Sequence, residues 1–393
     1  MALTLFKPQE RDTHPTIGSE ISLTQMSFNI HKFNNRPKPK ERDRILIISC
    51  FCEFGCEIVG RLYCLPRLIK RFPGRYIIVM GWHGREYLYR HLVDEFWEVN
   101  DEFMWLRDRT YAFHYRSKNL RRLEQSAAKY GTVVPTEALG TYVVGNFCIT
   151  CGKYWSEWKS HNDKCSNCQS TVLINSVFST TEEYKKTAVM IPRPSSAKLD
   201  WAKEFIKPNT VAIFARGRRT YGRNLTPEFY TKLINLLESK GYNCIWMGEK
   251  QSTLPCPVDH VYDFSRSEHA RDLEKTLAII SNCQFTIQFW TASSRLAGIM
   301  GVPFIIFESP EQIFCSGYTP GQEGRRLELT TFGPSKLVLS HYLRSLENQE
   351  GVLDLTNRAI DELVSLNTNY IIGLVEDEKS TQHLADVYYK ENS

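Results

Sequence analysis

The sequence of 393 residues lacks any apolar run of about 18 residues, the length that a membrane-spanning helix needs. The first residues, from Met1 to Lys7, lack the apolar core of a secretory signal. Neither a Gly-Lys-Ser/Thr phosphate loop nor a Gly-x-Gly-x-x-Gly turn occurs, and there is no short repeat or low-complexity tract. These absences weigh against an integral membrane protein, an ATPase of the phosphate-loop type and a dinucleotide-dependent dehydrogenase.

Strong charge of one sign is also lacking. The net charge of +5 permits an anionic ligand but does not require nucleic acid. Hydrophobic residues make up 42% of the chain and charged residues 24%, which is typical of a globular protein of two ordinary domains. Most of the 12 cysteines are scattered or lie in apolar segments, as in a reducing compartment, so the sequence predicts a cytoplasmic protein.

Four cysteines form a separate pattern in the middle of the chain. Cys148-Ile-Thr-Cys151 and Cys165-Ser-Asn-Cys168 are two C-x-x-C pairs with 13 residues between them. Two such turns supply the four thiolates of a closed tetrahedral zinc site. Because four protein ligands leave no open position for substrate, we expect structural Zn²⁺ in a zinc ribbon, with the chemistry elsewhere.

Buried-strand patterns alternate with helical patterns on both sides of this cysteine module. Continuous apolar runs of the kind found in parallel sheets alternate with amphipathic segments in the first half, and the alternation restarts after a linker at 192–196. The expected strands are 44–50, 76–81, 95–99, 210–215, 243–248, 261–264, 285–289 and 303–307, and the expected helices are 58–70, 86–91, 118–129, 227–240, 269–281 and 293–300. This order predicts an α/β fold with two doubly wound domains.

The expected boundaries follow from these patterns. We predict an irregular arm at 1–43, a first Rossmann-like domain, the zinc ribbon, a linker and domain crossover, a second Rossmann-like domain, and a helical C-terminal tail. The five segments after the arm are 44–144, 145–172, 173–208, 209–334 and 335–393. Since ligands bind beyond the carboxyl ends of parallel strands, two such domains facing each other would share a cleft, and functional residues should directly follow strands.

The loop after the first strand carries two carboxylates around a glycine, Glu53-Phe54-Gly55-Cys56-Glu57. A carboxylate in such a turn can accept a proton from an attacking hydroxyl, and the glycine permits close approach of a ligand. Alternatively, Glu57 only complements the dipole of the following helix. In the next such loop, His83 is a candidate for acid–base chemistry or acceptor binding, although a structural histidine is equally compatible with the pattern.

The segment from Glu53 to Ile58, with Leu65-Pro66-Arg67 and the stretch from Gly84 to Tyr89, resembles the N-terminal domain of GT-B glycosyltransferases with an E-x-G-x-E turn. It is broadly similar to heptosyltransferases. The resemblance covers about residues 44–100 and 210–310 and implies two Rossmann-like domains facing a cleft. It also implies an acidic base in this loop, and either Glu53 or Glu57 suits that role.

The loop after the first strand of the second domain is rich in arginine. Arg216, Arg218, Arg219 and Arg223 precede a helix that begins with Thr226 and Pro227. Helix N-termini and guanidinium groups both favour phosphate, so we expect a diphosphate here rather than a merely solvated basic loop. This stretch also resembles the arginine pair that holds the donor diphosphate in GT-B fucosyltransferases.

Two further strand ends supply candidate donor contacts. Thr291, Ser293 and Ser294 open a helix, where hydroxyls and free amides converge, and ordinary helix capping is the alternative explanation. Gly248 ends another strand and is a lower-ranked donor contact. The resemblance to heptosyltransferase-like enzymes implies that the loop at 291–294 of this chain contacts the donor.

The hypothesis from the sequence is a GT-B glycosyltransferase that moves a sugar from a nucleotide diphosphate to an acceptor hydroxyl, inverting and without a catalytic metal. Its acceptor stays open as a glycan, a small molecule or a nucleic acid. Aromatic residues in the ribbon and the basic helix at 118–129 could serve a nucleic-acid acceptor, but such aromatics more often pack a small domain, and the net charge of +5 is well below that of a strongly basic protein. A nucleotide-sugar epimerase and a non-catalytic binding protein on the same scaffold are the remaining alternatives.

Overall fold

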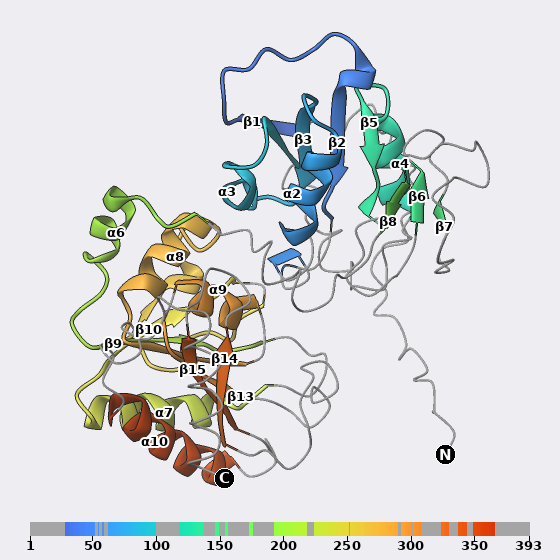
Figure 1. The fold of residues 1–393 in the computed structure, drawn as a ribbon. Coiled ribbons are helices and arrows are strands. Elements are labelled where there is room, and N and C mark those ends of the chain that lie inside the picture. Colours follow the sequence, from blue (N-terminus) through green and yellow to red (C-terminus); the bar gives the residue numbers. More distant parts are fainter. Residues whose placement is uncertain are drawn as a thin grey trace, which may run out of the picture.

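The computed structural model contains two large, mainly parallel sheets and one small antiparallel sheet (Figure 1). Within the described residues, no helix is both long and apolar enough to cross a bilayer. The structure describes residues 28–51, 54, 57–58, 62–99, 118–136, 146–148, 154–155, 173–175, 192–217, 224–250, 252–289, 292–300, 302–307, 324–329, 337–343 and 349–365.

The first sheet has the strand order β1-β4-β3-β2-β5. Its four parallel strands are β2 (Ile45–Ser49), β3 (Tyr76–Gly81), β4 (Glu95–Val99) and β5 (Thr132–Val134). Every residue of β2, β3 and β4 is buried, which explains why β2 and β3 appear in the sequence as nearly continuous apolar runs. Strand β4 also buries Glu95 and Glu98, and both carboxylates have hydrogen-bonding partners.

Helices cover both faces of this sheet. Side chains of α2 (Leu62–Arg71) and α3 (Glu86–Tyr89) join Leu46, Ile48 and Val79 in one buried cluster. Leu123 and Ala127 of α4 (Lys118–Ala127) pack with Ile45 and Ile47 on the opposite face. Adjacent residues of β2 thus face opposite helical layers, as the predicted doubly wound architecture requires.

The sequence predicted an irregular arm at 1–43, but part of this arm forms regular structure. Strand β1 (Phe28–Lys32) pairs antiparallel with β4 at the edge of the sheet, and a short 3-10 helix, η2 (Arg42–Arg44), precedes β2. Lys38 then donates to Glu95 at 3.0 Å. Strand β1 escaped prediction because it is short and lies at the sheet edge, where none of its five residues is buried.

The second sheet has the order β11-β10-β9-β12-β13-β15-β14. All adjacent pairs are parallel except β14 with β15. The strands are β9 (Thr210–Phe214), β10 (Asn243–Met247), β11 (Tyr262–Asp263), β12 (Phe285–Phe289), β13 (Phe304–Phe307), β14 (Gly324–Leu329) and β15 (Leu337–Leu343). From β9 the chain adds β10 and β11 on one side of this strand, and it then adds β12 and β13 on the other side. This is the strand order of a doubly wound nucleotide-binding fold.

The helices of the second half begin where the sequence provides caps. Thr226 accepts a hydrogen bond from the Phe229 amide at 3.2 Å at the start of α7 (Pro227–Ser239), as predicted. Asp272 caps α8 (Leu273–Asn282) by accepting from Lys275, so that helix begins later than expected. The other helical segments are α6 (Ser196–Ala202), η7 (Phe264–Arg266) and α9 (Ala292–Met300).

The C-terminal segment corrects the prediction of helices throughout 335–393. Strand β15 lies within this range and adds a parallel strand beside β13, where it also pairs with β14. One helix, α10 (Gln349–Ser365), follows and packs near α7, with Val352, Ala359 and Ile360 in the buried cluster between helices and sheet. Part of the expected tail therefore completes the second sheet.

The small sheet lies in the cysteine module at 145–172 and extends into the residues directly after it. Strand β6 (Asn146–Cys148) pairs antiparallel with both β7 (Tyr154–Trp155) and β8 (Leu173–Asn175), and Cys148 is in register with Leu173. For Cys148 the structure describes only the backbone, and Cys151, Cys165 and Cys168 lie outside the described residues. The four-thiolate zinc site therefore stays a prediction.

Candidate functional site

The order of the second sheet reverses between β9 and β12. From β9 the chain proceeds to β10 and β11 on one side, and it returns to β12 and β13 on the other. In such sheets the connections diverge at the reversal and leave a place for ligand at the carboxyl ends of the two strands. Phe214 is in register with Gln288, so Arg216 and Ser293 follow these two strands at the same edge of the sheet.

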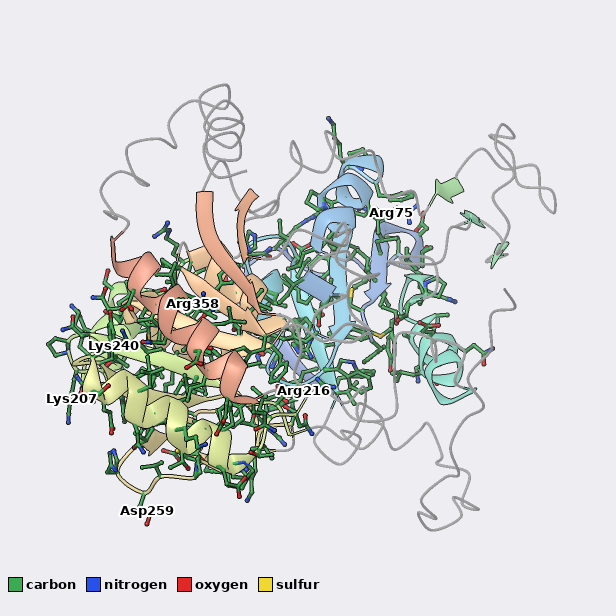
Figure 2. All side chains as sticks on the ribbon, turned by 90° about the horizontal axis from the view of Figure 1, so that it is seen from below. Arg75, Lys207, Arg216, Lys240, Asp259 and Arg358 are labelled. Carbon is green, nitrogen blue, oxygen red and sulfur yellow. The ribbon has the colours of Figure 1, made fainter. Side chains whose placement is uncertain are left out.

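The backbone holds the start of the arginine loop in place. Ala215 accepts a hydrogen bond from the Leu254 amide at 3.1 Å, and Gly217 donates to Ser252 at 2.9 Å. Arg216 itself forms a β-bridge with Thr253. Figure 2 shows Arg216 on the side of the second domain nearest the first, whereas Lys207, Lys240 and Asp259 lie on its far side. Arg216 thus extends from a fixed backbone at the reversal.

Gly248 has a structural reason to be glycine. Its φ of 129° is unfavourable for other residues, and an added Cβ would overlap the side chain of Thr253. Thr253 is the residue that bridges to Arg216. Through Thr253, the close approach at Gly248 therefore supports the backbone of the arginine loop. This structural role is separate from the predicted donor contact of Gly248.

The first sheet reverses between β2 and β5. Ser49, at the end of β2, forms a 2.7 Å hydrogen bond with the hydroxyl of Thr136, which follows β5. The same hydroxyl accepts from the Phe51 amide at 3.2 Å. Glu124 of α4 accepts from the Thr136 amide at 2.7 Å. This network fixes the beginning of the carboxylate loop at the reversal of the first sheet.

Glu57 is buried and held by two side chains. Arg85 donates to one of its carboxylate oxygens, and the Tyr89 hydroxyl donates to the other. Glu57 is 0% exposed and Arg85 is 3% exposed. The Arg85 guanidinium also lies over the Phe54 ring, 4.0 Å from its centre. The ion pair thus ties the loop after β2 to the loop after β3, and both Glu57 oxygens are engaged.

The sequence did not single out Arg85 and Tyr89 as site residues. Arg85 directly follows β3 and its turn, so the rule that polar residues after strands are functional candidates could have found it. Tyr89 carried no such signal because it lies on α3 and its role depends on Glu57, which is 32 residues earlier.

His83 contacts Glu98 through its Nδ1, and His31 contacts the other oxygen of Glu98 through Nε2 at 2.6 Å. Burial alone would raise the pKa of Glu98, but the hydrogen bonds and charges of the two histidines outweigh it and lower that pKa. His83 is about one-third exposed. The contact with Glu98 holds the His83 ring through its Nδ1.

The structure describes part of the predicted set of site residues. Ser293 lies half-buried in the first turn of α9, and for Ser294 only the backbone is described. The predicted residues outside the described part of the chain are Glu53, Gly55, Arg218, Arg219, Arg223 and Thr291. Arg216 and Ser293 are thus the described members of the two loops that flank the reversal.

The two halves of the chain meet through loops that follow strands. Gly84, in the loop after β3, lies so close to Arg271, in the segment between β11 and α8, that an added Cβ would be 2.7 Å from the Arg271 carbonyl oxygen. Arg90 donates to Glu274 of α8 at 3.2 Å. Because both segments leave the carboxyl ends of their sheets, these ends are directed toward each other at this junction.

Solved structures similar to the chain are heptosyltransferases and other glycosyltransferases. Escherichia coli ADP-heptose lipopolysaccharide heptosyltransferase II has a TM-score of 0.46 at 12% identity, over 82% of this chain and 97% of that one. A family 9 glycosyltransferase from Veillonella parvula has a TM-score of 0.43 at 12% identity, over 86% and 97%. Escherichia coli heptosyltransferase WaaC with ADP has a TM-score of 0.42 at 13% identity, over 81% and 98%.

A scan against protein-family models gave no match, and a sequence search of curated proteins gave none either. At 12–13% identity and TM-scores below 0.5, the likeness to solved structures does not establish a shared activity.

The junction at Gly84 gives a direct test. We expect Gly84→Ala to disturb the contact between the two halves, because the new methyl group meets a backbone carbonyl and the φ of 74° is strained for alanine. Gly74→Ala is the matched control, with a φ of 78° and no atom within 4 Å of the added Cβ. Urea unfolding should show a cost of about 1 kcal/mol for Gly74→Ala and more for Gly84→Ala.

Small-angle scattering of the folded variants should show a changed arrangement of the two halves only for Gly84→Ala. Equal stability losses and identical scattering for the two variants would contradict the proposed role of this contact.

Proposed function

We propose that the chain is a glycosyltransferase that moves a sugar from a nucleotide diphosphate to an acceptor hydroxyl. The observation that carries this proposal is the strand order of the second sheet, with an arginine loop and a hydroxyl-bearing helix start at its reversal. A carboxylate loop follows the first strand at the reversal of the other sheet. The junction at Gly84 directs the two sets of strand ends toward each other.

The donor diphosphate would bind at the second sheet. Arg216, Arg218, Arg219 and Arg223 would contact its oxygens, and the start of α9, with Thr291, Ser293 and Ser294, would offer hydroxyls and amide N–H groups. Guanidinium groups and the helix dipole would stabilise the negative charge that develops on the leaving diphosphate. This arrangement supports transfer without a catalytic metal.

The acceptor would approach from the first sheet, where Glu53 is the proposed base. In the transfer step the acceptor hydroxyl loses its proton to Glu53, and its oxygen forms a bond to the anomeric carbon. The bond from that carbon to the diphosphate breaks, and the diphosphate leaves with the electron pair. Attack opposite the leaving group inverts the anomeric configuration.

The surroundings of Glu57 favour Glu53 over Glu57 as the base. A base must reach the acceptor proton, whereas Glu57 is buried and both of its oxygens accept hydrogen bonds from Arg85 and Tyr89. We therefore assign Glu57 the role of positioning the loop that carries Glu53. Gly55, between them, and His83, beside Glu98, are proposed to face the acceptor.

Structural zinc in the cysteine module is part of the proposal. The first C-x-x-C begins at the last residue of β6, and the second precedes β8 by a few residues in sequence. The pairing of Cys148 with Leu173 brings the start of β8 beside the first of the four cysteines. This register supports the approach of both pairs to one tetrahedral ion held by Cys148, Cys151, Cys165 and Cys168.

The donor class is tested by thermal shift with ADP, GDP, UDP and CDP and their sugar derivatives. One diphosphate should raise the melting temperature by about 5 °C or more at a hundredfold excess over its Kd. Arg216→Ala should lose most of this shift, whereas Arg358→Ala should keep it, because Arg358 is an exposed arginine on α10. No shift with any diphosphate, or equal losses in both variants, would sink the donor proposal.

The base assignment predicts different defects for two isosteric variants. Glu53→Gln should lower sugar transfer by about 10²–10⁴-fold and leave the diphosphate-induced thermal shift intact. Glu57→Gln should instead destabilise the fold by about 3–5 kcal/mol in urea unfolding, because Arg85 stays buried without its charged partner. A Glu53→Gln protein with normal turnover would contradict this assignment, as would a stable but inactive Glu57→Gln protein.

Metal analysis tests the zinc proposal. The purified protein should contain about one zinc per chain, and Cys168→Ser should lose it. Cys256→Ser is the control, since Cys256 is a half-buried free cysteine outside the module. Zinc content that is absent from the natural chain, or unchanged in Cys168→Ser, would refute the four-thiolate site.

A further inference from the structure

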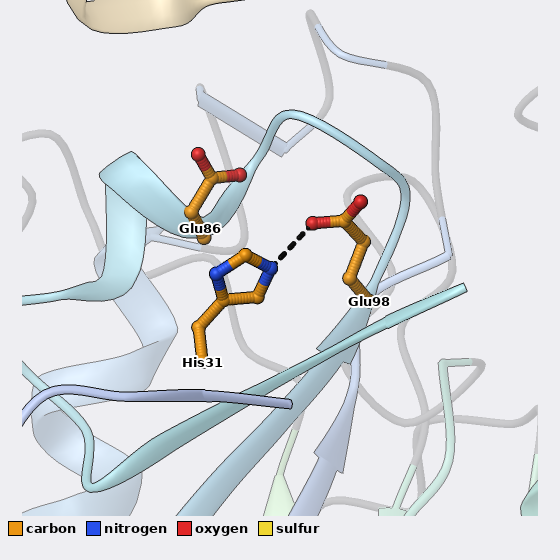
Figure 3. A group of neighbouring side chains, drawn as sticks. All are labelled: His31, Glu86 and Glu98. Carbon is orange, nitrogen blue, oxygen red and sulfur yellow. Dashed lines mark hydrogen bonds and ion pairs between the residues drawn. The ribbon is translucent and has the colours of Figure 1, made fainter. Parts of the chain in front are cut away.

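A cluster of metal-ligating side chains lies on the first sheet, apart from the cysteine module. His31 of β1, Glu86 of α3 and Glu98 of β4 come from three separate elements (Figure 3). One ligand atom from each lies within 4.8 Å of the others. The side chain of Glu98 is only 3% exposed, whereas that of His31 is 37% exposed, so the cluster is buried on one side and accessible on the other.

Glu86 distinguishes this cluster from an ordinary ion pair. His31 and Glu98 already satisfy each other through a 2.6 Å contact, so their pairing needs no third group. Yet the Glu86 carboxylate lies beside them with its Oε2 buried and without a hydrogen-bond partner in the part of the chain that the structure describes. A buried carboxylate oxygen with no donor is costly, and placing it near a second carboxylate adds repulsion. A cation between the two carboxylates would relieve both costs.

The donor set has the chemistry of a divalent metal site. Imidazole and carboxylate groups together suit first-row divalent ions, and three protein ligands leave further positions for water. The second oxygen of Glu98 contacts Nδ1 of His83, so a residue outside the proposed ligand set orients this carboxylate. Carboxylates that bind metals usually have such a partner. A metal ion at the first oxygen would take the place of the proton that His31 shares with Glu98.

We propose that His31, Glu86 and Glu98 bind a first-row divalent cation that fastens β1 to the edge of the first sheet. Strand β1 otherwise joins this sheet by pairing only with β4 among the described strands. The ion would add a link from β1 to α3, since Glu86 begins that helix. This proposal is independent of sugar transfer.

Mn²⁺ is the probe because it prefers oxygen and imidazole ligands to the four thiolates proposed for the cysteine module. We expect the full-length protein to bind one Mn²⁺ per chain in a titration followed by the loss of the electron paramagnetic resonance signal of hydrated Mn²⁺. Glu86→Gln and His31→Ala should each weaken binding by at least about tenfold. Glu86→Gln keeps the shape of the side chain, so it tests the site even if changes at Glu98 impair folding.

His260 and Glu238 provide the matched control. They form a 2.6 Å histidine–glutamate pair on the exposed surface of the second half, and the structure places no third metal-ligating side chain beside them among the described residues. Glu238→Gln should bind Mn²⁺ like the natural protein. Mn²⁺ should also raise the melting temperature of the natural protein and of Glu238→Gln, but not that of Glu86→Gln.

Three results would overturn the proposal. The natural protein could bind no Mn²⁺, Glu86→Gln and His31→Ala could bind it as tightly as the natural protein, or Glu238→Gln could lose as much affinity as they do. In each case the cluster would be a histidine–glutamate ion pair with a neighbouring carboxylate, and no metal site.

Discussion

The contact between α3 and α8 is the constraint on which the proposed site depends, because it sets how the ends of the two sheets face each other. Glu274 accepts hydrogen bonds from Arg90 at 3.2 Å and from the Ser195 amide at 3.0 Å. Burial would raise the pKa of Glu274, but these bonds and the charge of Arg90 lower it. Arg90 also lies 4.0 Å from the centre of the Tyr87 ring, and Tyr87 donates to Pro192. The linker that enters the second domain is thus held by both helices.

The junction between α3 and α8 also contains buried apolar side chains, in addition to the ion pairs at its surface. One buried cluster includes Leu273 and Leu277 of α8 together with Leu88 of α3 and Leu65 of α2. Partly exposed ion pairs such as Arg90–Glu274 contribute little by themselves, so most of the stabilisation should come from this apolar burial. The polar contacts then select the orientation in which the cluster packs.

Sequence patterns predicted the central strands well and the sheet edges poorly. Strands such as β2 and β9 are buried on both faces, and burial on both faces leaves an apolar run that needs no knowledge of the partner strand. Strand β1 is held by pairing with β4, which is more than 60 residues away, and its own residues are mostly exposed or half-buried. Likewise β15 joins the sheet through β13, and its local pattern was mistaken for a helix.

The same distinction applies to the candidate site. Its location could be predicted, because the rule that ligands bind at strand ends depends only on finding the strands, and Arg216 and Glu57 both follow one. The separate roles proposed for Glu53 and Glu57 could not be predicted, because the partners of Glu57 are Arg85 and Tyr89, from a different loop and helix. Pairings between distant loops leave no local pattern in the chain.

The buried Glu57–Arg85 pair shows why such a pairing is retained. Taking both charges out of water costs about as much as their attraction returns, so the pair is a poor source of stability compared with apolar packing. Its value lies in geometry, because the carboxylate that accepts from both Arg85 and Tyr89 ties Glu57 to the loop after β3 and to α3. Glu53 lies four residues before Glu57 in the same loop. In the proposed transfer, a base on the first domain must be aligned with a donor held by the second domain, and a fixed loop would favour that alignment. Under this proposal, the burial of Glu57 positions Glu53.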